Sequence, residues 1–177
     1  MAKYIYTNLR LPFEIISKHN GRNSIQINGL KGLLGKDSFS SMSKFASKYN
    51  IEYDRKKKQF INFKLFIIMD TDDCSEEAKQ AYISGGMFDG HWAKDYIVPI
   101  YNINNLEDVM HKSGIMTKRI ENKEKGNYYS RIFPINTDPP TKESMAQIKS
   151  FREKLSKVKE TNMTELIDYC LSIAENL

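Results

Sequence analysis

The stretch Phe63–Cys74, FKLFIIMDTDDC, decides how the rest of the chain is interpreted. An apolar run rich in β-branched and aromatic residues ends abruptly at Asp70, and Asp72 and Asp73 follow. A short apolar run without alternation predicts a strand that is buried on both faces, as in a parallel sheet. Because ligands of parallel sheets gather at the carboxyl ends of the strands, we expect these carboxylates at a functional edge.

Strand and helix patterns alternate on both sides of this stretch. Further strands are predicted at Ala2–Tyr6, Ser24–Ile27 and Tyr96–Tyr101, with a turn at Asn28-Gly29. Helices are predicted at Pro12–Lys18 (one or two turns), Asp37–Tyr49, Ser75–Ser84, Asn105–Lys112, Thr141–Val158 and Met163–Glu175. This alternation favours an α/β fold with a mainly parallel central sheet flanked by helices, followed by C-terminal helices.

The remaining segments are predicted to be irregular. Lys118–Asn127 is polar and is interpreted as a mobile loop, Tyr128–Pro134 as a short strand or extended arm, and Asn136–Pro140 as a loop. The 177 residues are sufficient for one domain with a substantial core. We therefore predict a single domain, 1–177, with a core over 1–115, a loop and arm over 116–140 and closing helices over 141–177.

Composition narrows the classes of function. The net charge of +5 favours an anionic partner such as nucleic acid. Cys74 and Cys170 are far apart and in no metal-ligand spacing, which argues against a disulfide framework or a structural zinc site. No segment has the pattern of a signal peptide or a membrane span, so we expect a cytoplasmic protein with no membrane partner.

The sequence Asp70-Thr71-Asp72-Asp73 is the most specific chemical signal. Asp70 and Asp72 are two positions apart, so in an extended backbone their side chains point the same way. Mg²⁺ suits one or two carboxylates together with water and a substrate phosphate, and Mn²⁺ is the alternative ion. The competing interpretation is a solvated turn in which Asp73 or Ser75 caps the next helix.

A hydrophobic strand that ends in Asp-x-Asp resembles the second motif of the topoisomerase–primase (Toprim) domain. The spacing is similar to that of Toprim-type proteins of the overcoming-lysogenization-defect and abortive-infection group, which act in phage defence. The resemblance covers roughly residues 1–115 and implies a Toprim-like, Rossmann-like fold. It also implies a metal-dependent nuclease, and a partner protein such as an ATPase, because family enzymes usually join the domain to one.

The resemblance assigns roles to further residues. Asp70 and Asp72 match Asp-x-Asp and would bind the metal together with Asp73. The helix after Tyr96–Tyr101 offers Glu107, and the segment before the amphipathic helix offers Lys36 to stabilise developing negative charge. The family carries a Glu at the end of its first strand, where this chain has Tyr6-Thr7-Asn8. Either Glu14 takes that place or the site is degenerate.

Three functions remain open at this stage. The first is a Mg²⁺- or Mn²⁺-dependent nuclease that acts on nucleic-acid phosphodiesters, DNA or RNA. The second is a non-catalytic Toprim-like module that binds or regulates a protein or nucleic-acid partner. The third is phosphoryl transfer on an aspartate, which also places Asp at strand ends. It fits less well, because neither the position of the motif nor the residues after the late strand match the known patterns.

Three other features have both a chemical and a structural interpretation. Arg55–Lys58 (RKKK) and Lys64 are either contacts to a nucleic-acid backbone or a solvated edge. His91 is either a general base or a packing residue. The glycines of Gly29–Ser38 lack phosphate-loop spacing, so a loop leading into a helix is expected there. Cys74 is rejected as a nucleophile, because the neighbouring carboxylates would raise its pKa.

Overall fold

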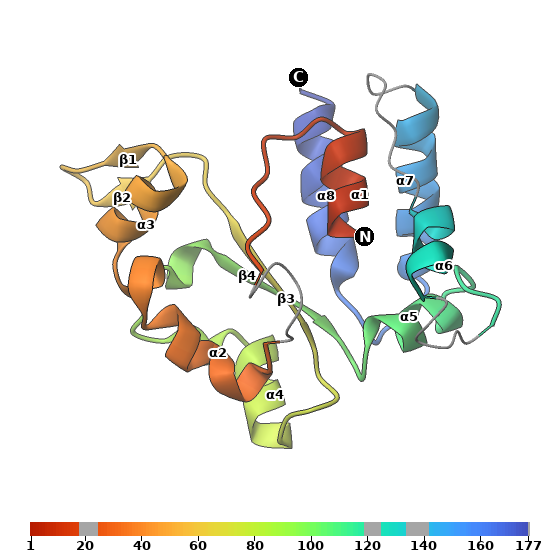
Figure 1. Cartoon of the computed structure of the whole chain (residues 1–177), viewed down its shortest axis with the longest axis horizontal. Helices are drawn as coiled ribbons and strands as arrows, with labels where there is room; N and C mark the ends of the chain where they lie inside the picture. Colours follow the sequence, from red (N-terminus) through yellow and green to blue (C-terminus); the bar gives the residue numbers. More distant parts are fainter. Residues whose placement is uncertain (18–24, 119–124, 134–141, 177) are drawn as a thin grey trace. The chain divides into compact units, whose positions relative to one another are not determined.

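The computed structural model describes residues 1–17, 25–118, 125–133 and 142–176. The described chain is mixed α/β, with helices α1 to α8 and a small parallel sheet (Figure 1). It divides into two compact units. We call Asn23–Tyr101 the strand unit, and Met1–Arg22 with Asn102–Leu177 the helical unit. The single domain over 1–177 stays a prediction.

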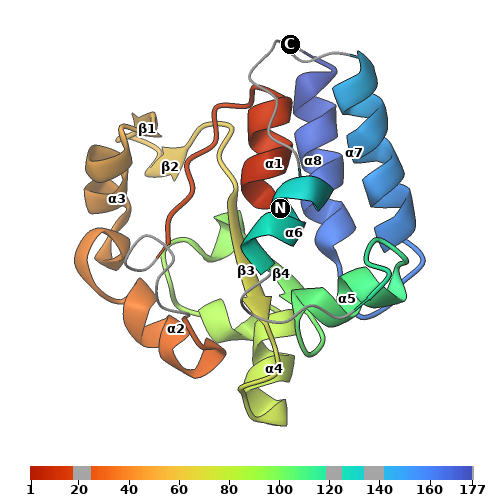
Figure 2. The same ribbon diagram turned by 45° about the vertical axis from the view of Figure 1, so that its right-hand side comes forward.

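The strand unit contains the sheet and the hairpin. Its helices are α2 (Ile27–Leu34), α3 (Met42–Tyr49) and α4 (Glu76–Ile83), with short 3₁₀ turns η2 (Asp37–Ser40), η3 (Gly86–Phe88) and η4 (Lys94–Tyr96). Its strands are β1 (Tyr53–Asp54), β2 (Gln59–Phe60), β3 (Leu65–Asp70) and β4 (Ile97–Asn102), the last of which ends at the unit boundary. Figure 2 shows β3, α4 and β4 as consecutive elements of one crossover.

The central strand and its partner form as predicted, but the sheet is small. β3 pairs with β4 in parallel, and in the described chain no further strand joins them. The buried Tyr82 of α4 connects the two strands, since its hydroxyl lies 2.6 Å from the Ile67 carbonyl oxygen and 3.0 Å from that of Ile100. The prediction that β3 is buried on both faces is wrong, because Ile68 remains 36% exposed. Side chains of a strand point to the two faces of the sheet, so burial on both faces requires an element packed on each face.

The start of the strand unit is helical, which corrects two predictions. The described end of the predicted strand Ser24–Ile27 is not a strand, and Asn28-Gly29 lies inside α2. Ile27, Leu30 and Leu34 recur at helical spacing and are buried against Met69, Tyr82 and Phe88. The spacing of three and four residues decides for a helix, because it places all three side chains on one face.

The predicted helix Asp37–Tyr49 forms in two pieces. η2 covers its start, and α3 begins after Ser41, whose hydroxyl accepts a hydrogen bond from the Lys44 amide. The cap of α3 is therefore Ser41, whereas a helix that began at Asp37 would have Asp37 or Ser38 as its cap. Phe45 of α3 is buried in a cluster of aromatic rings that also contains Phe39, Tyr49, Phe60, Phe63 and Trp92.

His91 and Trp92 hold this aromatic cluster to the segment after α2. The Nε2 atom of His91 lies 3.0 Å from the Leu34 carbonyl oxygen and 3.1 Å from that of Phe39, and Trp92 Nε1 donates to the same Phe39 oxygen. The other ring nitrogen, Nδ1, accepts from the Ala93 amide. Because both nitrogens of the ring are engaged in backbone contacts, His91 has the packing role.

The helical unit contains α1 (Ala2–Asn8), α5 (Leu106–Lys112), α6 (Lys125–Ile132), α7 (Lys142–Leu155) and α8 (Met163–Ala174). The predicted helices at Asn105–Lys112, Thr141–Val158 and Met163–Glu175 all form, although α7 ends at Leu155 and α8 ends at Ala174, before the predicted ends. Asn105 caps α5 by accepting from the Asp108 amide. Its C-terminal end is followed by Gly114, whose φ of +69° suits a residue without a Cβ.

Two predictions of extended structure in this unit are wrong. Ala2–Tyr6 belongs to helix α1, because Tyr4, Ile5 and Asn8 share one buried face that packs on the unit's other helices. Tyr128–Ile132 belongs to α6, where Tyr129 and Phe133 follow one another at a spacing of four. Phe133 packs against Tyr4 and Phe151. In both segments the tertiary partners select the helical period over a strand.

The predicted short helix Pro12–Lys18 is also wrong, since the described residues 11–17 form no helix. Ile15 and Ile16 are exposed there, so the segment lacks the buried apolar face that stabilises the short helices of this chain. The predicted loops 118–127 and 136–140 fall largely outside the described residues, although residues 125–127 open α6. Among the described helices, none is long and apolar enough to cross a membrane.

Candidate functional site

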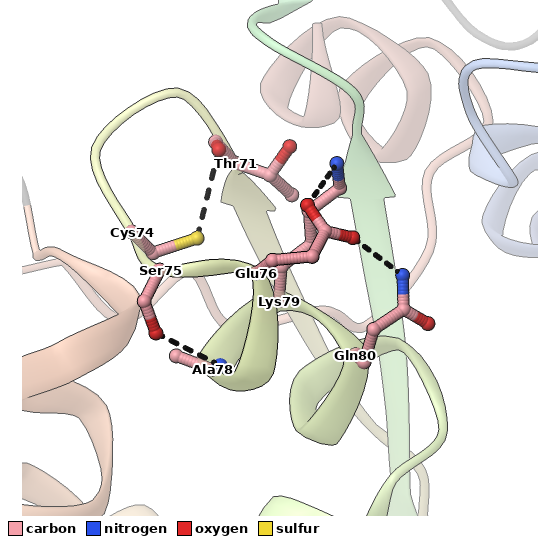
Figure 3. Close-up of polar contacts among 7 residues, drawn as sticks. All are labelled: Thr71, Cys74, Ser75, Glu76, Ala78, Lys79 and Gln80. Carbon is pink, nitrogen blue, oxygen red and sulfur yellow. Dashed lines mark hydrogen bonds and ion pairs between the residues drawn. The ribbon is translucent and has the colours of Figure 1, made fainter.

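The acidic turn is the segment Asp70–Ser75, which connects β3 to α4. Asp70 is the last residue of β3, and Asp70, Asp72 and Asp73 are all exposed to solvent. The turn ends at Ser75, whose Oγ accepts a hydrogen bond from the Ala78 amide and caps α4 (Figure 3). Of the predicted site residues, these three aspartates are brought together in one short turn at the carboxyl end of a parallel strand.

Thr71 lies between Asp70 and Asp72 in the acidic turn, and the sequence pattern assigns it no chemical role. Its side chain is buried, with 7% of its surface exposed, and its hydroxyl has no hydrogen-bond partner among the described residues. Successive residues along a strand face opposite sides, so Thr71 continues the buried face of Ile67 and Met69 while Asp70 continues the face of Ile68. A buried hydroxyl without a partner costs about 1–3 kcal/mol.

The backbone of the turn is closed by Cys74. Its Sγ lies 3.5 Å from the Thr71 carbonyl oxygen, the contact drawn in Figure 3. Burial raises the pKa of this thiol, Lys79 opposes the rise, and Glu76, Asp72 and Asp73 add to it. A raised pKa lowers the fraction of reactive thiolate near neutral pH. Burial is the larger cause, whereas the sequence suggested only the carboxylates.

The two glutamates that follow, Glu76 and Glu77, form hydrogen bonds and an ion pair with residues at the start of α4. Glu76 lies 2.8 Å from Gln80 Nε2 and 3.2 Å from Lys79 Nζ, and these contacts lower its pKa. Hydrogen bonds to its own backbone amide and to Ser75 lower the pKa of Glu77. Carboxylates in a first helical turn also complement the helix dipole. These local interactions explain why Glu76 and Glu77 stand at this position, so no bound ligand is needed to explain them.

Lys36, the cation in the predicted set, lies in the strand unit. It is exposed and immediately precedes η2, while Gly29 and Gly32 lie within α2. Because those glycines are helical, the segment forms no glycine-rich phosphate loop. The expected loop is reduced to the short stretch between α2 and η2.

The last two predicted residues belong to the helical unit. Glu14 is exposed on the irregular stretch 11–17. Glu107 is half-buried in the first turn of α5, where its Oε1 accepts a hydrogen bond from the Tyr129 hydroxyl at 2.8 Å. The sequence did not indicate Tyr129, because its partner lies more than twenty residues away in the chain. The predicted set thus draws its residues from both units.

The chemistry of the acidic turn is that of a small set of oxygen donors. Within the described chain, no group of three or more His, Cys, Asp or Glu side chains is placed to hold a metal ion. A protein-only cage of the zinc or calcium type is therefore not built from these residues. Two neighbouring carboxylates are nevertheless the donor set with which Mg²⁺ is commonly held, the other positions being filled by water and substrate oxygen.

Comparison of the chain with protein-family models, curated proteins and solved structures found no match. The likeness to Toprim domains therefore rests on the sequence pattern quoted above.

Proposed function

We propose that this protein hydrolyses nucleic-acid phosphodiesters with a Mg²⁺ or Mn²⁺ ion held at the acidic turn. The observation that carries the proposal is the arrangement at the end of β3. Two exposed carboxylates, Asp70 and Asp72, flank a buried Thr71 whose hydroxyl has no partner among the described residues. Exposed carboxylates beside an unsatisfied hydroxyl form an oxygen-rich edge, which is the environment that a hard cation prefers.

The residues of the turn suit such an ion. Asp70 and Asp72 would hold it, and Asp73 adds negative charge nearby. When bound, the ion polarises a phosphoryl oxygen and lowers the pKa of coordinated water. Glu107, oriented by Tyr129, is proposed as a further ligand or general base, and Lys36 as the cation that stabilises developing charge. Glu14 is proposed as the substitute for the family's first acidic residue.

The order of elements supports a Toprim-like arrangement. β3 ends in Asp-x-Asp, α4 crosses to the parallel strand β4, and α5 follows with Glu107 in its first turn. This is the order that the resemblance implies for the second half of the domain. A role in phage defence and an ATPase partner are proposals that rest on the same resemblance.

A second candidate is a non-catalytic module that binds a protein or nucleic acid. It is favoured by α1, which is helical where the resemblance expects a strand ending in Glu. With that strand missing, the described chain retains only part of the expected acidic set. In this case the acidic turn would serve as a capped helix start, and turnover would be absent.

The test compares the wild-type protein with the double variant Asp70→Asn, Asp72→Asn on plasmid DNA and on a structured RNA. Each reaction is run with Mg²⁺, with Mn²⁺ and with EDTA, and Mn²⁺ binding is measured by calorimetry. The matched control is Glu52→Gln, Asp95→Asn, which removes two exposed carboxylates of the same unit. Loss of first carboxylate ligands is expected to weaken Mn²⁺ binding by at least about tenfold.

The outcomes separate the two candidates. Metal-dependent cleavage that the Asp70/Asp72 variant loses and the control variant keeps supports the nuclease and names its substrate. Mn²⁺ binding that is equally tight in wild type and the Asp70/Asp72 variant overturns the assigned site. If wild type cleaves neither substrate with either metal, the non-catalytic module becomes the better account.

A further inference from the structure

The basic hairpin is the segment Tyr53–Phe60, in which β1 and β2 pair antiparallel around the loop Arg55–Lys58. The pairs are Tyr53 with Phe60 and Asp54 with Gln59. Asp54 Oδ1 accepts hydrogen bonds from the Lys56 and Lys57 amides at 2.9 and 3.0 Å. The one acidic residue of the hairpin therefore shapes the loop backbone, and its carboxylate faces the loop amides.

The base of the hairpin is anchored in the aromatic cluster. Phe60 is 6% exposed and packs on Phe45, Phe63 and Trp92. Its backbone amide donates to the Tyr96 hydroxyl at 3.0 Å. Because the base of the hairpin is packed, the backbone of the charged loop loses little conformational freedom on binding. The loop is therefore preorganised for a ligand.

The four cations of the loop are not neutralised within the described chain. Arg55, Lys56, Lys57 and Lys58 are all exposed, and none of them forms an ion pair with a described residue. Four like charges in consecutive positions repel one another, and solvent ions screen that repulsion only in part. A polyanion would relieve the repulsion and release its own condensed counterions.

Charge is segregated along the strand unit. Residues 23–64 contain nine lysines and arginines against three carboxylates, whereas residues 65–101 contain two against seven. The basic hairpin belongs to the first part and the acidic turn to the second. Both views place the hairpin and α4 at opposite ends of this unit (Figures 1 and 2). The cations of the loop are therefore not explained as partners of the acidic turn.

We propose that the basic hairpin binds the phosphate backbone of a nucleic acid without reading its sequence. The proposal rests on the proposed function and names the surface that would hold its substrate. The loop offers only Arg and Lys, the side chains that contact phosphates and set affinity. A membrane surface is the less favoured partner. Within the described strand unit, the large exposed apolar side chains are Ile61, which follows the hairpin in sequence, and Ile68, and stable membrane attachment requires a larger apolar face.

The test measures binding in EDTA, so that no cleavage takes place. Fluorescence anisotropy follows labelled duplex DNA and duplex RNA of one sequence, across salt concentrations from about 50 to 200 mM. The variant Arg55→Gln, Lys56→Gln, Lys57→Gln, Lys58→Gln removes the four charges. The control variant replaces four exposed cations of the helical unit, Lys3, Lys154, Lys157 and Lys159, by Gln. Circular dichroism and thermal melting check that both variants fold.

The hairpin variant is expected to bind at least about tenfold more weakly than wild type near 100 mM salt, with the slope of log K against log salt reduced by about three. The control variant is expected to stay within about twofold of wild type at the same salt. The DNA and RNA arms show which backbone is preferred. In EDTA the Asp70→Asn, Asp72→Asn variant is expected to bind no more weakly than wild type, because the substitutions remove negative charge. Loss of binding in the hairpin variant and loss of cleavage in the aspartate variant therefore test the two proposals separately.

Three outcomes overturn the proposal. One is equal weakening by the hairpin and control variants, which would reflect net charge alone. Another is the absence of wild-type binding to either duplex at the lowest salt. The third is a hairpin variant that keeps full affinity for both duplexes but loses binding to vesicles containing phosphatidylserine, which would assign the hairpin to a membrane surface.

Discussion

Thr71 shows how one residue connects the fold to the candidate site. Its neighbours Asp70 and Asp72 are exposed, yet strand alternation carries the Thr71 side chain to the buried face of the sheet. Its hydroxyl then has no partner among the described residues. A group that costs stability is a candidate for a functional role, because unpaired buried polar groups are rare in folded proteins.

Replacing Thr71 by Val separates stability from function. Valine has nearly the same shape, so the variant is expected to unfold with a free energy equal to wild type or higher by up to about 2 kcal/mol, since the unpaired hydroxyl is removed. If the hydroxyl contributes to the metal site, Mn²⁺ binding weakens in the same variant. Urea unfolding and calorimetric Mn²⁺ titration measure the two effects.

The matched control is Thr117→Val at an exposed threonine, for which neither quantity is expected to change. A loss of more than about 1 kcal/mol in Thr71→Val would contradict the account, because it would mean that the hydroxyl has a stabilising partner.

Among the elements, α4 positions the acidic turn. Ser75 caps its first turn, Tyr82 reaches both parallel strands, and Gly85 ends it with a φ of +77°. The same hydrogen bonds that begin the helix therefore set where the aspartates lie. The competing interpretation from the sequence, that Ser75 caps the helix, is correct, and it is compatible with a metal at Asp70 and Asp72.

Substituting Ser75 by Ala tests this cap. The variant is expected to lose about 1 kcal/mol of unfolding free energy, because the Ala78 amide loses its acceptor. Ser47→Ala, at an exposed position inside α3, is the control, and it is expected to be neutral or slightly stabilising, because Ala is the better helix former. Chemical denaturation gives both values. Equal losses in the two variants would show that the Ser75 hydroxyl is not acting as a cap.

For the molecule as a whole, both units bury weakly acidic side chains that are neutral near pH 7, and Tyr82 and Cys170 are examples. In the strand unit, burial raises the pKa of Tyr82, although its hydrogen bond to Ile100 opposes the rise. In the helical unit, burial raises the pKa of Cys170 from its ordinary value near 9 to about 12. In both groups the folded state holds its proton more tightly than the unfolded chain does. The stability that these two protonated groups contribute is therefore fully present below about pH 8 and is lost as pH rises.

The Cys170→Ala variant isolates the contribution of this thiol. It is expected to be less stable than wild type at pH 7, because a buried side chain is shortened. The difference is expected to stay constant from about pH 6 to 8 and then to shrink, by up to about 1.4 kcal/mol per pH unit, between about pH 9 and 12. Urea unfolding in the presence of a reductant measures it. A difference that is constant to pH 11 would contradict the assignment.

The local sequence was sufficient to predict those helices and strands that local interactions stabilise. The run Leu65–Met69 formed β3, and Ser75 and Asn105, both of residue types that favour helix caps, begin α4 and α5. The long amphipathic pattern of the C-terminal segments also formed α7 and α8. In these segments propensity, capping and periodicity all favour the same element.

Short apolar segments fit both the helical period and the strand period, so only their tertiary contacts decided which element they form. The segments Ala2–Tyr6 and Tyr128–Ile132 became helices because their buried partners lie far away in the sequence. The size of the sheet depends on which strands pair, and the exposure of Ile68 depends on what packs on its face of the sheet; no single segment determines either. The sequence by itself determined the three aspartates and the strand before them. Only the tertiary structure decided that Thr71 is buried and that Glu107 meets Tyr129, because burial and contact depend on residues distant in the chain.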